Sequence, residues 1–255
     1  MPGIISTDIS GHVGIVHMLR TEKHNAFNRE LDAAVAAALG ELDADPEVHV
    51  AILTGSGTAF SAGADMNEAV EAIDGKGRTE GMARTYVAVA SFRKPLIAAV
   101  NGICYGGGAL VAINCDIRIA SETAAFRFPG AEYGLVVGGA QLPRIIGPAF
   151  AKDLLFTGRV VHAEEALRIG LVNAVVPFAR VEAAAMAMAA MIAANSPPAL
   201  IATKETVDRA TSIDEGAERE GAWNRDLRTS PEHHERFRRA AARVAKGNAG
   251  KADGP

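Results

Sequence analysis

The sequence predicts an α/β protein, because a buried strand, a loop of small residues and a helix follow one another twice in its first half. The first strand is the apolar, β-branched run at residues 50–53, and the loop after it ends at Asp65. Asp65 stands where it can cap a helix that runs on to Ile73. The second unit begins with the strand Leu96–Val100 and opens its helix with the glycines from Gly106 onward.

The loops of both units are suited to binding negative charge. The N–H groups in the first turn of a helix have no partner within the helix, and the helix dipole places positive charge there. Small residues at positions 61–64 and 106–108 leave such N–H groups accessible to a ligand. Two of these helix N-termini facing each other would hold one oxygen between two amides, which is the geometry of an oxyanion hole.

Further strands and helices are predicted around these two units. Residues 4–9 and Val13–Met18 predict a β-hairpin. After Asn28, apolar residues recur at helical spacing, which predicts an amphipathic helix that ends before Pro46. The polar segment at residues 73–80 is either a mobile flap near the site or a plain surface loop. We also expect helices at residues 82–92, 149–156, 163–169 and 180–194, and strands at residues 117–120, 125–128 and 172–176.

The domain organisation follows from strand–strand–helix units at residues 10–30, 50–75 and 96–125, which form a loose internal repeat. This repeat favours one spiral domain over two independent ones. We place the core at residues 1–195 and a helical, arginine-rich region at residues 196–255. The apolar residues of the C-terminal region are expected to pack on a neighbouring element or on another subunit. They are Leu200, Ile201, Val207, Trp223, Leu227 and Phe237.

Composition and charge argue against several classes of protein. The 255 residues carry a net charge of −4, whereas a protein that binds nucleic acid would need a basic stripe. No apolar run reaches the roughly 18 residues that span a bilayer, and the N-terminus lacks the features of a signal peptide, so we expect a cytoplasmic protein. The histidines show no metal-ligand spacing, and we interpret Cys104 and Cys115 as buried, reduced residues.

Four motifs give the chain a resemblance to a known family. They are Arg20-x-x-Lys-His-Asn-Ala-Phe-Asn, Leu53-Thr-Gly-x-Gly-x-Ala-Phe-Ser-Ala-Gly-Ala-Asp, Pro95-Leu-Ile-Ala-Ala-Val-Asn-Gly with its three following glycines, and Asp116-Ile-Arg-Ile-Ala. In this order and spacing they resemble the crotonase (enoyl-CoA hydratase/isomerase) family over residues 4–204. The resemblance implies a crotonase-like spiral of ββα units that assembles into a homotrimer or a dimer of trimers through its C-terminal helices. It also implies a coenzyme A thioester as substrate or ligand, with no separate cofactor and no metal.

The same resemblance assigns site residues. The backbone N–H groups of Ala64 and Gly107 correspond to an oxyanion hole that would bind the thioester oxygen and stabilise an enolate. For Lys23 and His24 a solvated turn is the alternative interpretation, and Asp65 is expected mainly to cap its helix. The residues that would line the coenzyme A moiety are Lys23, His24, Ala26, Ala62, Asp65 and Met66.

The chain departs from the family where hydratases carry two glutamates that activate water. Leu110 and Gly130 stand at those two positions, and Gly138 stands where some isomerase relatives have an acid. Hydration needs both a base and an acid, so we do not expect ordinary hydratase activity. Glu132 is the candidate for a replacement acid or base, although its register suggests a surface position. Leu110 and Gly130 are also expected to leave a roomier, more apolar pocket.

Two functions are compatible with these observations. The first is an enzyme that acts on an acyl-CoA or enoyl-CoA through the two amides, with relocated acid–base groups. The second is a non-catalytic acyl-CoA-binding protein that keeps the loops and lacks turnover. A dinucleotide-binding protein is disfavoured, because the glycines at residues 106–108 lack the spacing of that fingerprint.

Overall fold

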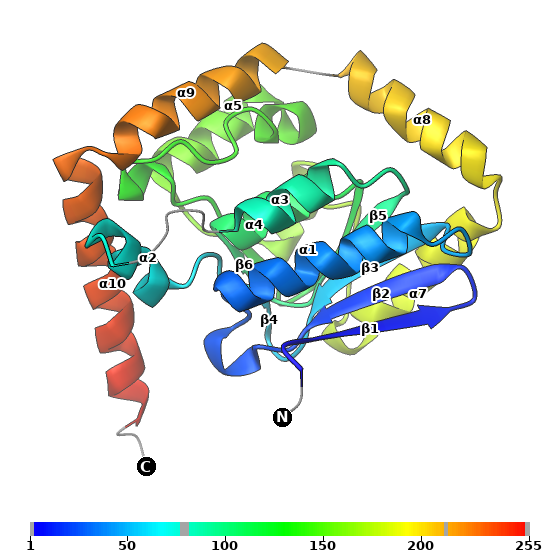
Figure 1. Ribbon diagram of the computed structural model, residues 1–255, viewed down its shortest axis with the longest axis horizontal. Coiled ribbons are helices and arrows are strands. Elements are labelled where there is room, and N and C mark those ends of the chain that lie inside the picture. The colour runs from blue at the N-terminus through cyan, green and yellow to red at the C-terminus, as the bar shows by residue number, and fades with distance from the viewer. Residues whose placement is uncertain (1–2, 77–81, 212–213, 253–255) are drawn as a thin grey trace.

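Two β-sheets form the centre of the protein, which a computed structural model describes at residues 3–76, 82–211 and 214–252 (Figure 1). The larger sheet has six strands in the order β1-β2-β3-β5-β7-β10. β1 and β2 form the predicted antiparallel hairpin, and the following pairs are parallel. The strands are β1 (Ile5–Ser10), β2 (Val13–Met18), β3 (Val50–Gly55), β5 (Leu96–Val100), β7 (Ile117–Ser121) and β10 (Ala174–Val176).

The smaller sheet has the order β4-β6-β8-β9. It comprises β4 (Ala59–Ser61), β6 (Ile103–Tyr105), β8 (Ala125–Arg127) and β9 (Val161–His162). The sequence predicts β8 but not β4, β6 or β9, because two or three residues are too few to show a periodic apolar pattern. Since β3 leads into β4 and β5 leads into β6, each unit places one strand in each sheet before its helix. This ββα arrangement confirms the predicted α/β spiral.

Helices surround the sheets and mostly begin and end close to the predicted positions. α5 differs, because it starts at Leu142 and contains a break at Gly147, whose φ is +75°. The part after this break corresponds to the predicted helix. Residues 77–81, which belong in part to the segment interpreted as a flap or a surface loop, lie outside the described residues. The helices ahead of the C-terminal region are α1 (Arg29–Ala44), α2 (Met66–Ile73), α3 (Ala83–Ala90), α4 (Gly107–Asn114), α5 (Leu142–Thr157), α6 (Ala163–Arg168) and α7 (Val181–Ala193).

The central strands of the larger sheet are buried on both faces, and β3 illustrates the reason. Val50 and Ile52 point toward a cluster completed by α7, whereas Ala51 and Leu53 point into the larger core that α1 and α4 cover. All four side chains are fully buried. A parallel strand that is covered on both faces has a continuous apolar sequence. This pattern is the one that predicts β3 from the sequence.

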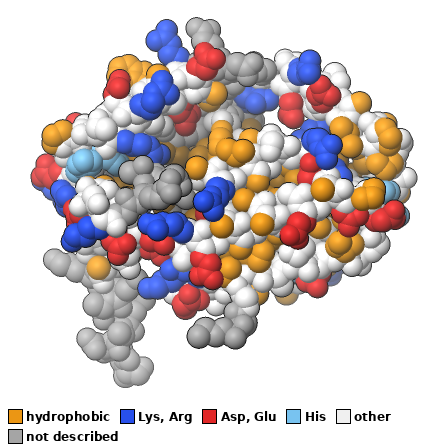
Figure 2. Space-filling view, in the orientation of Figure 1, with side chains coloured by type: hydrophobic (Ala, Val, Ile, Leu, Met, Phe, Trp, Pro, Cys, Tyr) orange, Lys and Arg blue, Asp and Glu red, His pale blue; other side chains and the backbone are white. Residues whose placement is uncertain are grey.

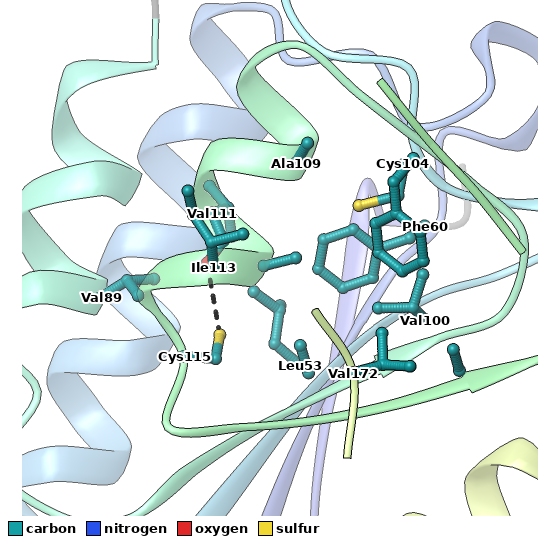
Figure 3. Close-up of a cluster of buried hydrophobic side chains, with 14 of the residues drawn as sticks. Leu53, Phe60, Val89, Val100, Cys104, Ala109, Val111, Ile113, Cys115 and Val172 are labelled. Atoms are coloured by element: carbon teal, nitrogen blue, oxygen red, sulfur yellow. Dashed lines mark hydrogen bonds between the residues drawn. The ribbon is translucent and has the colours of Figure 1, made fainter. Parts of the chain in front are cut away.

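Both cysteines lie in the larger core, as predicted (Figure 3). Cys104 belongs to the same cluster as Phe60, and the Cys115 thiol donates to the Val111 carbonyl oxygen at 3.5 Å. Burial raises the pKa of Cys104 well above its usual range and that of Cys115 to about 12. Thiols that stay protonated in apolar surroundings are unreactive, so these two residues serve the packing of the core.

The C-terminal region consists of α8 (Pro197–Ala210), α9 (Asp214–Arg228) and α10 (Pro231–Ala252). α8 runs apart from the sheets in Figure 1, whereas α10 lies beside α2 and is tied to it by an Arg238–Asp74 ion pair at 2.7 Å. Phe237 is buried on a neighbouring element of its own chain, with its ring 5.4 Å from that of Tyr133. Trp223, by contrast, is 59% exposed.

None of the described helices is by itself long and apolar enough to cross a membrane. The segment Phe178–Ala193 and the helix Pro197–Ala210 meet the criteria of length and composition only when taken together, and they are bent by 106°. Within the same described residues, no group of three or more His, Cys, Asp or Glu side chains is placed to hold a metal ion.

Candidate active site

The segment before α1 and the loop before α2 run side by side and are joined through their backbones. The Ala62 N–H donates to the His24 carbonyl oxygen at 2.9 Å, and the Phe27 N–H donates to the Gly63 carbonyl oxygen at 2.7 Å. The Asp65 N–H then donates to the Phe27 carbonyl oxygen at 2.9 Å. These bonds bring together the two stretches that are predicted to bind coenzyme A.

The N–H of Ala64 points away from this ladder. Phe27 and Ala64 form a parallel bridge, in which Phe27 bonds to the carbonyl of Gly63 and to the N–H of Asp65. In such a bridge the central residue turns its own N–H and C=O to the opposite side. Ala64 is exposed, and among the described residues no backbone acceptor takes its N–H. This amide is therefore available to a ligand.

The second amide belongs to Gly107, the first residue of α4. Its N–H lies in the first helical turn and has no acceptor in the described part of the backbone. The loop of Ala64 touches it directly: a Cβ on Gly63 would lie 2.8 Å from the Tyr105 carbonyl oxygen and 3.1 Å from the Gly107 nitrogen. Gly63 also has a φ of +98°, so only glycine fits there. Two consecutive ββα units thus bring the loop of Ala64 and the N-terminus of α4 close together at Gly63.

Asp65 is held by its own helix and by Arg20. Its Oδ1 accepts hydrogen bonds from the N–H groups of Asn67 and Glu68, as the predicted helix cap. Its Oδ2 lies 2.7 Å from Arg20 Nη1, and both side chains are largely buried. Burial alone would raise the pKa of Asp65, but the Arg20 guanidinium and the two N–H donors together lower that pKa below its ordinary value. Asp65 is therefore an ionised anchor of the loop.

The predicted coenzyme A residues divide into exposed and buried ones. Lys23 and His24 are exposed at a tight turn in which His24 and Asn25 have positive φ angles of 50° and 52°. The Asn25 side chain, fully buried, holds this turn by donating to the carbonyl oxygens of Ser56 and Ala59. The sequence does not indicate the contacts of Asn25 with Ser56 and Ala59 or of Arg20 with Asp65, because these partners lie far apart along the chain. Ala26 is buried, and Ala62 and Met66 are half-buried.

The side chain of Met82 lies against Gly107. A Cβ on Gly107 would come within 1.8 Å of Met82 Sδ, so the thioether occupies the space where any other residue would have its side chain. Met82 stands at the start of α3, and α3 packs on α4. The sequence gives no signal of this contact, which places an apolar, flexible side chain next to one of the two amides.

The surroundings of Gly138 and Gly130, two positions at which the resemblance implies an acid, differ. A Cβ on Gly138 would meet Ile113, Phe128 and Leu110 at 3.5–3.9 Å. The expectation of a roomier pocket is wrong at Gly130, because a Cβ there would lie 2.9 Å from the Leu135 carbonyl oxygen and 3.1 Å from Val137. The chain folds back on itself at this point and fills the space that a larger side chain would need.

Comparisons with known proteins assign the chain to a family. A family model described as enoyl-CoA hydratase/isomerase matches residues 8–249. The chain belongs to this family. It is therefore a member of a family of enzymes, and the crotonase fold expected from the motifs is confirmed.

Relatives within the family include proteins named for two reactions. The short-chain-enoyl-CoA hydratase of Clostridium acetobutylicum is 39% identical over 210 residues, which cover 80% of each protein. The crystal structure of an enoyl-CoA hydratase/isomerase from Pseudoalteromonas atlantica has a TM-score of 0.84 at 29% identity and covers 95% of this chain and 97% of its own. A monofunctional enoyl-CoA isomerase from M. smegmatis has a TM-score of 0.68 at 31% identity, with 91% and 98% covered.

Glu132, the candidate acid or base of this family member, is engaged by two arginines. Its Oε2 pairs with Arg127, and its Oε1 lies 2.8 Å from Arg243 Nη2 of α10. The next residue, Tyr133, holds α10 as well, since His233 Nδ1 lies 2.6 Å from its carbonyl oxygen. These contacts favour a structural role in which Glu132 fastens α10 to the core.

Glu132→Gln is accordingly expected to leave the turnover of an enoyl-CoA unchanged. The free energy of unfolding should fall by at most about 1 kcal/mol, because partly exposed ion pairs contribute little. Steady-state kinetics and urea denaturation measure the two effects. A loss of about 10²-fold or more in kcat, the size of a general acid–base contribution, would instead assign the proton transfer to Glu132.

Proposed function

We propose that the protein acts on an acyl-CoA or enoyl-CoA thioester, whose carbonyl oxygen is bound by the N–H groups of Ala64 and Gly107. Two amide donors aimed at one oxygen stabilise the negative charge of an enolate more than the neutral carbonyl of the ground state. The observation that carries this proposal is the direct contact of the two amide loops at Gly63. The thioester is itself the substrate, and we propose no separate cofactor.

Coenzyme A would lie along the paired segments before α1 and α2. The exposed ammonium of Lys23 is suited to a phosphate, as a flexible point charge. His24 stands beside it, and the half-buried Ala62 and Met66 offer apolar surface to the pantetheine arm, with the buried Ala26 beneath the same segment. Asp65 contributes by ordering the loop through Arg20.

The missing acids bear on the reaction. Leu110, Gly130 and Gly138 hold no carboxyl group, and a Cβ on Gly138 would lie 3.9 Å from Leu110 Cδ1. Activation of a water by the usual pair of carboxylates has no counterpart at these positions. We therefore propose enolate chemistry other than ordinary hydration.

We further propose a homotrimer or a dimer of trimers assembled through the C-terminal helices. This proposal is supported by exposed apolar side chains on those helices, among them Val207 at 55% and Trp223 at 59% exposure. Light scattering of the purified protein tests it, with Trp223→Glu as the variant expected to weaken the assembly.

Calorimetric titration with a panel of acyl- and enoyl-CoA esters tests the proposed function, together with the change in enoyl absorbance over time. We expect binding and turnover of at least one ester. Binding without any turnover would leave the alternative of a non-catalytic acyl-CoA-binding protein. No binding to any ester would refute the proposal as a whole.

A further inference from the structure

A carboxylate from the C-terminal region lies beside the position at which this chain lacks an acid. Glu220, on α9, accepts a hydrogen bond on Oε1 from the Gly138 N–H at 3.0 Å and on Oε2 from the Ala140 N–H at 2.9 Å. A Cβ on Gly139 would lie 3.4 Å from the same Oε2. The loop at residues 138–140 thus has no acidic side chain of its own but holds one supplied by a distant helix.

The Glu220 carboxylate lies close to the backbone of Gly138. Because Oε1 is 3.0 Å from the Gly138 nitrogen and the N–Cα bond is about 1.5 Å, that oxygen lies within about 4.5 Å of the Gly138 Cα. A carboxylate can accept about four hydrogen bonds. The two backbone donors hold the Glu220 carboxylate in position and use about two of these acceptor sites. On the side of the absent Gly138 Cβ lie Leu110, Ile113 and Phe128.

α4 links the Gly138 loop to Gly107, because Leu110, whose Cδ1 would lie 3.9 Å from a Cβ on Gly138, follows Gly107 by about one helical turn. Met82, whose sulfur lies against Gly107, stands at the start of α3, and Tyr86 follows in the first turn of the same helix. Tyr86 is half-buried, and its hydroxyl accepts from Gln141 Nε2 at 2.7 Å. Burial and the negative charge of Glu220 raise the pKa of Tyr86, so its phenol stays protonated beside the carboxylate.

Two more observations indicate a site for a ligand or water here. Gln141 Oε1 is buried and has no hydrogen-bond partner among the described residues. The Glu220 carboxylate forms no ion pair with a described Lys or Arg, in contrast to Glu132, which has two. No described cation therefore occupies the remaining acceptor sites of this carboxylate.

We propose that Glu220 is the proton-transferring group of this protein, brought to the thioester site by α9, and that the reaction is a double-bond shift in an enoyl thioester. This inference rests on the function proposed above. One carboxylate suffices for such a shift, because the base that removes a proton from one carbon can return it to another. Water addition would need a second group to activate the water.

The step conserves atoms and electrons. The Glu220 carboxylate takes a proton from the α-carbon of a β,γ-unsaturated thioester, and the C–H electron pair forms a dienolate. The dienolate oxygen accepts from the Ala64 and Gly107 N–H groups. The Glu220 carboxylic acid then gives its proton to the γ-carbon. In the product the double bond lies between the α- and β-carbons. Nothing is oxidised or reduced, and no co-reactant is consumed.

The test uses the full-length protein, 3-hexenoyl-CoA as the probe, and the variants Glu220→Gln, Glu220→Asp and Asn224→Ala. Asn224 is the matched control, because it lies one turn after Glu220 on α9 and holds the N–H and carbonyl of Val136 in the same loop, without a titratable group. Readouts are the conjugated enoyl absorbance, deuterium uptake at the α- and γ-carbons from heavy water, and the Kd for the probe.

We expect Glu220→Gln to lose at least about 100-fold in kcat and in deuterium uptake, the usual contribution of a general acid–base group. The Kd should change little, Glu220→Asp should recover part of the rate, and Asn224→Ala should keep most of it. Equal losses in Glu220→Gln and Asn224→Ala would show that α9 only shapes the loop, and would overturn the proposal. So would an unchanged kcat in Glu220→Gln, or a 3-hydroxyacyl product. Absence of binding by the wild type would refute the proposed function itself, before any variant is compared.

Discussion

Removal of the Gly107 N–H is expected to lower kcat toward an enoyl-CoA by about 10²- to 10³-fold, or roughly 3–4 kcal/mol of transition-state stabilisation. Proline at position 107 removes this donor and is compatible with the first position of a helix, so α4 should persist. The substitution belongs in a Met82→Ala background, because the Met82 thioether occupies the space of any new Cβ.

Gly107→Ala in the same background is the control, since it adds the Cβ and keeps the N–H. Steady-state kinetics on both double variants, with calorimetric Kd values, separate loss of the donor from loss of space. Equal kcat values in the proline and alanine variants would mean that the Gly107 amide does not contact the developing charge. The Ala64 amide would then be left as a single donor, and the two-amide site would be wrong.

Asp65→Ala is expected to lower the free energy of unfolding by about 3 kcal/mol, because it removes the buried carboxylate that pairs with the largely buried Arg20 guanidinium. Loss of the α2 cap adds about 1 kcal/mol. Asp65→Asn is the matched variant, since asparagine caps a helix as well as aspartate does but removes the charge. Urea denaturation of both variants, and of Arg20→Ala and the double variant, measures the coupling between the two side chains.

The same ion pair gives stability a defined dependence on pH. The folded-state pKa of Asp65 is lowered, so its contribution is fully present above the unfolded value of about 3.9 and is lost as the pH falls through the folded-state pKa. The urea midpoints of wild type and Asp65→Asn, measured from pH 2 to pH 6, should therefore differ least at pH 2. A difference that stays constant across this range would contradict a charge-based contribution.

Features that depend on residues close together in the sequence could be predicted from the sequence. The strand of β3, the cap of α2 at Asp65 and the helix opening at Gly107 each rest on a local pattern of burial, capping or glycine content. The order of the motifs also indicated the family and its spiral fold. The short strands β4, β6 and β9 gave no such signal, because their pairing partners, and not their own residues, make them strands.

The sequence by itself thus determined the repeat of strand, loop and helix, the two glycine-rich helix N-termini and the absence of acids at residues 110, 130 and 138. Only the tertiary structure decided what surrounds them: Arg20 against Asp65, Met82 against Gly107, and Glu220 against Gly138. The physical reason is that capping, periodicity and φ preference act over a few residues. The partner of a buried charge or an open amide is chosen by the packing of helices and sheets from distant parts of the chain.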